Sequence, residues 1–230
     1  VLPPPATPLE DGHAVDFLID TIRSEENGSV TIAPIGPLTN IAMALRQAPD
    51  IAERIGRIVM MGGGYFEGGN ITPAAEFNIH VDPQAAAEGF AAGIPITMMP
   101  LDVTHKAMTT AVRTAEIRAI GSKTAIVVAD MLEFYERFDE EKYGSDGGPL
   151  HDPCAIAWML QPEIFSGRHC NVEIETGSQT KHVRDTLESR MAFKVAELRA
   201  TISDFIADVL ANFEQCWHIQ LQTLMKDYKD

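Results

Sequence analysis

The stretch Ser29-Val30-Thr31-Ile32-Ala33-Pro34-Ile35-Gly36-Pro37-Leu38 decides how the fold of this chain is read. Its first five residues are mostly apolar or β-branched and predict a buried strand. The Pro and Gly residues that follow predict a turn at the carboxyl end of that strand. Residues 38–48 then have the apolar spacing of a helix. A short buried strand followed directly by a turn and a helix is typical of a βα unit.

The same pattern recurs over the first hundred residues. A helix is predicted from Asp11 onward, and residues 57–61 and 94–99 are predicted as further buried strands. Between them, Asp82 suits the N-cap of a helix and Pro83 suits its first turn. Strands and helices alternate at this spacing when the sheet is mainly parallel. We therefore predict an α/β fold, with a mainly parallel open sheet that carries helices on both faces.

The next part of the chain is predicted to be helical with one interruption. Helices are expected over about residues 114–120 and 125–138, followed by an acidic, Gly-rich loop over residues 139–148. Asp152 and Pro153 can then cap and start another helix.

The last fifty residues have a different character. Apolar residues recur there every three or four positions in a segment without Pro or Gly: Met191, Val195, Leu198, Ile202, Phe205, Val209 and Phe213. This spacing predicts a long amphipathic helix that packs on the core or on another subunit. We divide the chain into an α/β core, residues 1–180, and a helical C-terminal segment of the same domain, residues 181–230.

The composition of the chain excludes several classes of protein. It has 230 residues, of which 45% are hydrophobic and 22% charged, as in ordinary globular domains. A net charge of −15 argues against nucleic acid or an anionic membrane as a partner. There is no apolar run of about 18 residues that would span a bilayer. Cys154, Cys170 and Cys216 are widely spaced, which favours reduced thiols and predicts a cytoplasmic protein.

Polar residues follow the predicted strand at residues 57–61 and the three glycines after it. Asn70, Glu76 and Asn78 lie within nine residues. Amides offer hydrogen-bond donors and acceptors while ionised Glu only accepts, so the three can surround a polyhydroxylated ligand. The alternative is a polar loop that uses Asn and Gly for its turns. Residues 102–105 are predicted as a loop after the strand at residues 94–99. In parallel sheets ligands bind at the carboxyl ends of strands, and this rule places Ile35, residues 61–78 and residues 102–105 on one rim.

A second polar pair occurs at the predicted start of a late helix. His151 can donate a proton near physiological pH, and Asp152 can act as an anionic ligand. The alternative is an N-cap Asp preceded by an ordinary loop His. Asp102 and His105 are interpreted first as capping residues.

Together these segments resemble the inosine-uridine-preferring nucleoside hydrolase family. The matching stretches occur in the family's order and spacing over roughly residues 10–180, and they are residues 33–42, 61–65, 70–78, 82–83, 101–105 and 151–153.

The resemblance implies both an activity and a sugar site. Members of this family hydrolyse the N-glycosidic bond of ribonucleosides to ribose and free base, in purine and pyrimidine salvage. By resemblance, Asn70, Glu76 and Asn78 hold the ribose, and Met61 packs beside it. A homo-oligomer, either a dimer or a tetramer, is expected.

The resemblance also implies a metal ion and an acid. A bound Ca²⁺ holds the ribose hydroxyls and a nucleophilic water, with Asp152 and the backbone carbonyl of Ile35 among its ligands. His151 matches the residue that protonates the departing base.

The chain departs from the family at one place. The family's N-terminal aspartate cluster, of the form DxDxGxDD, supplies most calcium ligands and the base that activates water, and it does not occur here. The chain also begins at Val1 rather than Met, so we expect an incomplete form that lacks the first βα unit and part of the calcium site. We therefore expect little or no hydrolase activity from these 230 residues alone. The alternative is a catalytically inactive relative that acts as a binding or self-assembly module.

Overall fold

The computed structural model describes residues 11–143, 147–176 and 183–185, and the statements below concern these residues. The chain divides into two compact units. The first comprises Val1–Ala107 and Leu150–Val195, and the second comprises Met108–Pro149 and Ala196–Asp230. Each unit is described by itself.

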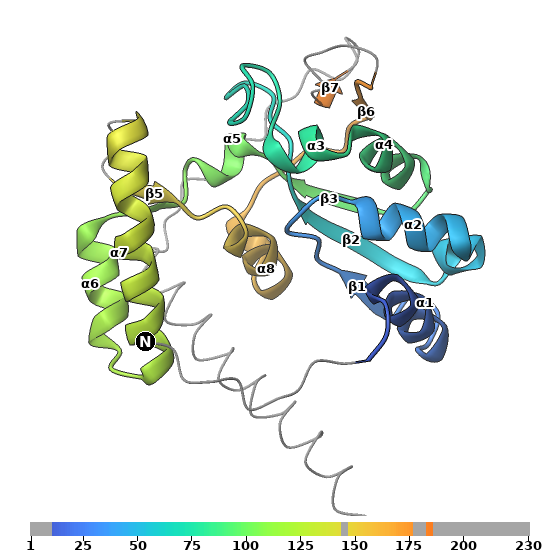
Figure 1. Ribbon diagram of the computed structural model, residues 1–230, viewed down its shortest axis with the longest axis horizontal. Coiled ribbons are helices and arrows are strands. Elements are labelled where there is room, and N and C mark those ends of the chain that lie inside the picture. Colours follow the sequence, from blue (N-terminus) through green and yellow to red (C-terminus); the bar gives the residue numbers. More distant parts are fainter. Residues whose placement is uncertain (1–10, 144–146, 177–182, 186–230) are drawn as a thin grey trace, which may run out of the picture. The chain divides into compact units, whose positions relative to one another are not determined.

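The first unit is built on a parallel sheet. Its strands are β1 (Val30–Ile32), β2 (Ile55–Met61) and β3 (Ile96–Met99), in the order β1-β2-β3 (Figure 1). Both pairs are parallel, with Ile32 opposite Ile58 and Met61 opposite Met99. The carboxyl ends of β2 and β3 therefore lie side by side, which brings the segments that follow them to one edge of the sheet.

Short helices connect and surround these strands. They are α1 (Ala14–Ser24), α2 (Thr39–Gln47), η1 (Pro49–Glu53), α3 (Phe77–Val81), α4 (Pro83–Ala91), α5 (Leu101–Thr104), α8 (Pro153–Leu160) and η2 (Pro162–Ile164). A small antiparallel pair, β6 (Val172–Ile174) with β7 (Val183–Asp185), lies near α4.

The sheet is covered on both faces, as predicted. Because successive side chains of a strand point to opposite faces, neighbouring residues of β2 enter different clusters. Ile58 and Met60 are buried in a cluster with residues of α1, α2 and α4. Val59 is buried in another cluster, with Val103 and with Ala155 of α8. The predicted α/β class, with a parallel sheet between helices, is confirmed.

The second unit is mainly helical. It contains α6 (Ala111–Ala119), α7 (Lys123–Tyr143) and a two-residue antiparallel pair of β4 (Met108–Thr109) with β5 (Gly148–Pro149). The prediction that a loop begins at residue 139 was wrong, because α7 continues to Tyr143. Residues 139–143 contain neither Gly nor Pro, and charged residues of this kind tolerate a helix well.

Other predictions had mixed outcomes. Residues 102–105 were predicted as a loop, but residues 101–104 form the short helix α5. The amphipathic helix predicted over residues 191–213, and the boundary at residue 181, lie outside the described residues.

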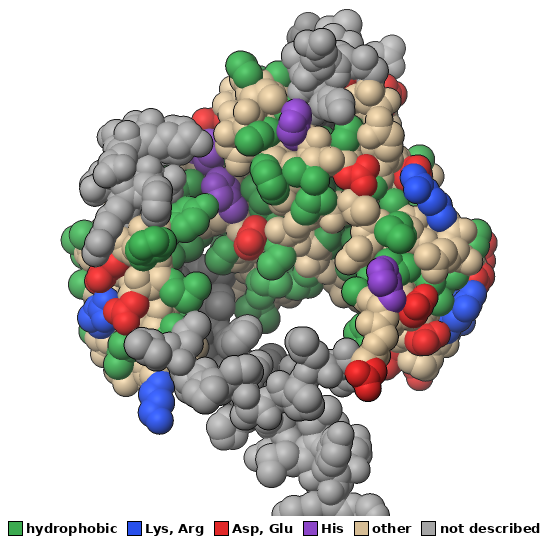
Figure 2. Space-filling model, viewed as in Figure 1, with side chains coloured by type: hydrophobic (Ala, Val, Ile, Leu, Met, Phe, Trp, Pro, Cys, Tyr) green, Lys and Arg blue, Asp and Glu red, His purple; other side chains and the backbone are tan. Residues whose placement is uncertain are grey.

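The surface of the described part carries scattered charges. On the face shown in Figure 2, acidic side chains are spread rather than gathered, and Lys and Arg are few. Arg23 pairs with Asp50, and Arg46 pairs with Glu88, all four being well exposed. No helix among the described residues is both long enough and apolar enough to span a bilayer.

Candidate active site

The carboxyl end of β2 leads into a glycine turn that fixes the geometry of the candidate site. Gly63 has a φ of 79°, a left-handed conformation that favours glycine over residues with a side chain. A Cβ at Gly64 would run into the carbonyl oxygen of Gly68. The backbone carbonyl of Gly63 accepts a hydrogen bond from the N–H of Leu101 at 2.9 Å, which joins this turn to α5.

Glu76 is the buried acceptor around which this turn closes. Only 3% of the residue is exposed, and it occupies the N-cap of α3. Its Oε2 accepts from the backbone N–H of Gly63 at 2.9 Å, of Asn78 at 2.9 Å and of Ile79 at 3.4 Å. Burial raises the pKa of Glu76 more than these three donors lower it, and the charge of Asp152 raises it further. Asp152 therefore lies within electrostatic range of Glu76.

Asn70 and Asn78 each use one atom of the side-chain amide to bind the protein itself. Asn70 Oδ1 accepts from the N–H of Phe77 at 2.9 Å. Asn78 Nδ2 donates to the carbonyl of Met61 at 3.2 Å and lies 3.4 Å from the Met61 sulfur. Asn78 and Met61 are thus in contact, as the predicted ribose site requires.

Each of these three side chains has a second polar atom that is left over. Glu76 Oε1, Asn70 Nδ2 and Asn78 Oδ1 make no hydrogen bond within the described residues. In that part of the chain the one buried side-chain polar atom without a partner is His80 Nδ1, so the three leftover atoms reach solvent. Two acceptors and one amide donor at the surface of a rigid turn suit a ligand with neighbouring hydroxyl groups.

Ile35 lies in the turn that follows β1. The carbonyl of Pro34 accepts from the N–H of Met61 at 3.1 Å, which attaches this turn to the end of β2. Ile35 itself is 48% exposed. The structure therefore brings the turn at Ile35 to the same sheet edge as Met61, as the predicted rim requires.

Asp102 does not cap a helix, contrary to our first interpretation. It lies inside α5 rather than before it, and its carboxylate accepts from the backbone N–H groups of residues 65–67 at 2.8, 2.7 and 3.2 Å. Asp102 is 7% exposed and anchors the loop that leads to Asn70. The predicted cap at Asp82 is confirmed, since its side chain accepts from the N–H of Ala85 at 3.1 Å.

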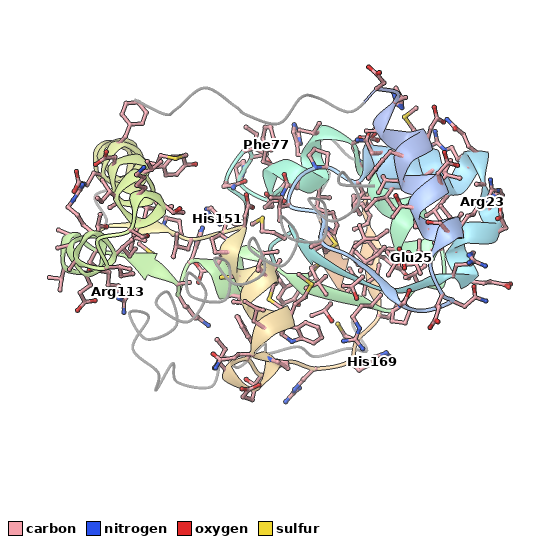
Figure 3. All side chains as sticks on the ribbon, turned by 90° about the horizontal axis from the view of Figure 1, so that it is seen from below. Arg23, Glu25, Phe77, Arg113, His151 and His169 are labelled. Atoms are coloured by element: carbon pink, nitrogen blue, oxygen red, sulfur yellow. The ribbon has the colours of Figure 1, made fainter. Side chains whose placement is uncertain are left out.

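His151 lies just before α8 and contacts two residues of the α5 segment. Its Nδ1 is 2.8 Å from Thr104 Oγ1, and its ring centroid is 5.6 Å from that of His105. Burial, with a smaller effect of His105, lowers the pKa of His151 to about 4. Figure 3 shows His151 and Phe77, the first residue of α3, well away from Arg23 and Glu25, which lie at the C-terminal end of α1.

Asp152 occupies the N-cap position of α8, but its side chain makes no capping hydrogen bond. Burial raises the pKa of its carboxyl group. The capping role considered for Asp152 is therefore not fulfilled. Within the described residues its carboxylate has no capping partner, and a carboxylate in that state can bind a ligand or a cation.

A calcium ion fits these residues in kind but not in number. The Asp152 carboxylate and a backbone carbonyl at Ile35 are hard oxygen donors, whereas Ca²⁺ takes about six to eight of them. Among the described residues no group of three or more His, Cys, Asp or Glu side chains is placed to hold a metal ion. Within the described part of the chain, these two donors alone therefore do not complete a calcium site.

Two residues of this site were missed as functional candidates from the sequence. Asp102 and Thr104 belong to residues 102–105, which were placed on the rim but interpreted as a loop with capping residues. The available signal was the position of this stretch directly after β3. At the carboxyl end of a parallel strand, polar residues face the ligand edge.

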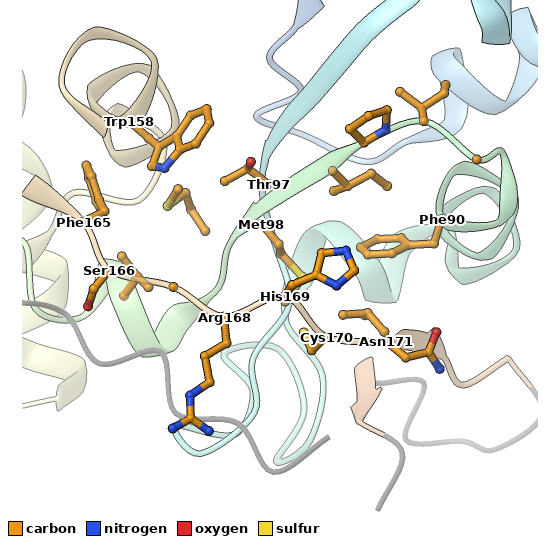
Figure 4. Close-up of a pocket in the computed structure, with 18 residues that line it drawn as sticks. Phe90, Thr97, Met98, Trp158, Phe165, Ser166, Arg168, His169, Cys170 and Asn171 are labelled. Atoms are coloured by element: carbon orange, nitrogen blue, oxygen red, sulfur yellow. The ribbon is translucent and has the colours of Figure 1, made fainter. Parts of the chain in front are cut away.

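A separate apolar groove runs along β3 (Figure 4). It has a volume of about 700 Å³ and is lined by Phe90, Met98, Trp158 and Phe165, among others. Arg57 places its guanidinium 5.3 Å from the Trp158 ring centroid. None of the predicted site residues and no acidic side chain lines the groove. His169 and Arg168 do line it, so the groove differs from the predicted site in its residues and not by a lack of ionisable groups.

Comparison with known proteins identifies the class. The inosine-uridine preferring nucleoside hydrolase family matches residues 1–205, so this chain belongs to that family. An uncharacterized protein of Schizosaccharomyces pombe is 55% identical over 179 residues, which are 78% of this chain and 58% of that protein. A pyrimidine-specific ribonucleoside hydrolase of Photobacterium profundum is 49% identical over 182 residues, again 78% of this chain and 58% of that protein.

Solved structures agree in fold. A purine-preferring ribonucleoside hydrolase from Gardnerella vaginalis is 35% identical with a TM-score of 0.75, and the match covers 81% of this chain and 59% of that one. A plant nucleoside hydrolase is 31% identical with a TM-score of 0.71, covering 74% of this chain and 54% of that one. The chain thus spans less than two thirds of the length of these relatives.

Proposed function

We propose that this chain carries the sugar-binding and base-facing part of a ribonucleoside hydrolase, which cleaves the N-glycosidic bond to give ribose and free base. The observation that carries the proposal is the set of leftover polar atoms on Glu76, Asn70 and Asn78. Two similar enzymes are named for opposite base preferences, pyrimidine and purine. Since both act on ribonucleosides, their shared feature supports recognition of the ribose, and we assign no base preference.

Ribose recognition is the first part of the proposed mechanism. Glu76 Oε1 accepts from one sugar hydroxyl, Asn78 Oδ1 accepts from a second, and Asn70 Nδ2 donates. Met61, held against Asn78, packs beside the sugar. When the glycosidic bond breaks, positive charge develops on the ring, and a nearby carboxylate stabilises that charge more than it stabilises the ground state.

Assistance to the leaving base is the second part. A nucleobase leaves more easily when it receives a hydrogen bond or a proton, and we assign this role to His151. The lowered pKa means that the ligand-free chain holds the ring neutral at neutral pH. A neutral ring assists through a hydrogen bond from its N–H group. Full proton transfer requires that the bound ligand raise the pKa.

A metal ion is the third part. Nucleoside hydrolases are in general metal-dependent, and we propose Ca²⁺ with Asp152 and the carbonyl of Ile35 as two of its oxygen ligands. Such an ion would make bound water a better nucleophile near neutral pH. Because the described oxygen donors fall short of a full set, we derive no step through it. We expect ribose release from uridine or inosine to stay near background, and turnover at an ordinary enzyme's rate would contradict this expectation.

Nucleoside binding tests the sugar site without requiring turnover. Saturation-transfer NMR of the chain with uridine or inosine is expected to show binding. The matched 2′,3′-dideoxynucleosides should bind at least about tenfold more weakly, because the bound sugar then covers polar atoms of the site without offering them a hydrogen-bond partner. The Asn78→Ala variant should weaken ribonucleoside binding and leave the dideoxy form unchanged. Equal affinity for both sugars would contradict the proposed ribose site.

Two further properties belong to the proposal. We propose a homo-oligomer, a dimer or tetramer, in the cytoplasm. The buried free thiol of Cys154 supports a reducing compartment. Light scattering of the purified chain tests the oligomer, and a monomer would contradict it.

A further inference from the structure

We propose that Thr104 positions the imidazole of His151, by binding Nδ1 so that Nε2 is the ring nitrogen available to a ligand. The role of His151 toward the leaving base rests on the proposed function, whereas the arrangement of its ring rests on the structure alone. The carrying observation is the 2.8 Å contact between Thr104 Oγ1 and His151 Nδ1.

Thr104 is itself held rigidly. It is fully buried, and its backbone N–H donates to the carbonyl of Pro100 at 3.1 Å. The start of the same helix is tied to the glycine turn through the hydrogen bond from Leu101 to Gly63. A buried Thr in a helix has only two favourable χ1 rotamers, so its hydroxyl has few alternative positions.

The backbone around His151 is fixed as well. The N–H of Leu150 donates to the carbonyl of Ala107 at 2.8 Å, and the N–H of Cys154 donates to the carbonyl of His151 at 3.2 Å. With its backbone held, His151 can move mainly by rotation about its side-chain bonds. A single hydrogen bond at Nδ1 is enough to select one orientation of the ring.

The contact also determines which nitrogen carries the proton in the neutral ring. Within the described residues Thr104 Oγ1 has no other hydrogen-bond partner, and a buried hydroxyl proton left without an acceptor is costly. The hydroxyl therefore donates to Nδ1, which must have a lone pair, and the proton of the neutral ring is on Nε2. Nε2 makes no hydrogen bond within the described residues. Within the described residues this N–H donor is thus left available to a ligand.

The arrangement makes α5 the common support of both parts of the site. Asp102 holds the loop at residues 65–67, and Thr104, two residues later, holds His151. His105 adds a 3.4 Å contact to Glu67. One short helix thus sets the sugar-binding loop and the base-facing imidazole.

The test is the tautomer of His151, read from long-range ¹H–¹⁵N correlations of the ring in the ligand-free chain. Wild type is expected to show a pyridine-like Nδ1 and a pyrrole-like Nε2. Thr104→Val is nearly isosteric but lacks the hydroxyl. It should lower the ratio of the Nε2–H tautomer to the Nδ1–H tautomer about fivefold to tenfold. Thr104→Ser should give the wild-type spectrum, because Ser keeps the hydroxyl.

Several outcomes would overturn the proposal. A wild-type ring with its proton on Nδ1 would do so even if Thr104→Val failed to fold. An unchanged tautomer ratio in a folded Thr104→Val chain would also do so, as would a Ser variant that behaves like Val. Since the spectrum is recorded without nucleoside, a chain that shows the predicted tautomer but binds no ribonucleoside would refute the proposed function and leave this inference standing.

Discussion

The loop at Glu76 and the segment at His151-Asp152 lie at the same edge of the sheet but are built differently. Around Glu76, carboxylates accept from several backbone N–H groups, and the fold itself completes the site. At residues 151–152 the Asp side chain makes no capping hydrogen bond, and the described hydrogen bonds of the His ring come to one, with Thr104. The first region is expected to be stable without ligand. The second depends on Thr104 and on whatever binds Asp152.

The strongest test of this comparison removes the Glu76 carboxylate. Glu76→Ala leaves three backbone N–H groups without an acceptor, so the free energy of unfolding should fall by about 3–5 kcal/mol. Glu76→Gln is the matched control. It keeps one acceptor oxygen and should lose less. Urea denaturation measures both, and a loss below about 1 kcal/mol for Glu76→Ala would show that the carboxylate does not organise the turn.

The anchoring role of Asp102 predicts the next largest effect. Asp102→Ala should lower the free energy of unfolding by about 2–3 kcal/mol and speed amide hydrogen exchange at residues 65–67. The control is Asp82→Ala, which removes a helix cap worth about 1 kcal/mol and should leave exchange at residues 65–67 unchanged. Equal exchange in the two variants would contradict the anchoring role.

The lowered pKa of His151 predicts a pH dependence of stability. The pKa is about 4 in the folded chain and 6.5 when unperturbed, so between these values the unfolded chain binds the extra proton. Stability should be fully present above pH 6.5 and fall as the pH drops toward 4. The contribution is about 2 kcal/mol after allowing for the solvent contact of a partly buried ring. Denaturation of wild type and of His151→Gln between pH 4 and 6.5 isolates the His151 contribution. If the free energies of unfolding of the two proteins changed in parallel with pH, the lowered pKa of His151 would be contradicted.

Substitution of Asp152 should have the smallest effect on stability. Its pH dependence should also be opposite in sign to that of His151. Burial raises the pKa of its carboxyl group in the folded chain, so its favourable contribution exists at low pH and is lost as the pH rises through the folded pKa. At neutral pH, Asp152→Asn should change the free energy of unfolding by no more than about 0.5 kcal/mol, toward greater stability. A loss comparable to that of Glu76→Ala would show that the carboxylate has a structural partner.

Much of the fold could be predicted from sequence because its signals are local. The strands at residues 30–32 and 96–99 and the cap at Asp82 all follow from short patterns. The extension of α7 to Tyr143 was missed because a run of charged residues was interpreted as a loop.

The site was predicted unevenly for a related reason. Asn70, Glu76 and Asn78 are close in sequence, so their grouping could be seen directly. The roles of Asp102 and Thr104 depend on partners 35 to 47 residues away, and no local pattern indicates such contacts.

A map of where a ribonucleoside binds this chain tests the proposed sugar site at Glu76 directly. In ¹H–¹⁵N spectra, added uridine or inosine should shift the backbone amides of Gly63, Phe77 and Asn78, whose N–H groups bind the side chains that would hold the ribose. The amides of Thr97 and Phe165, in the apolar groove along β3, should stay unchanged. Shifts confined to that groove, with the Glu76 loop unaffected, would contradict the account.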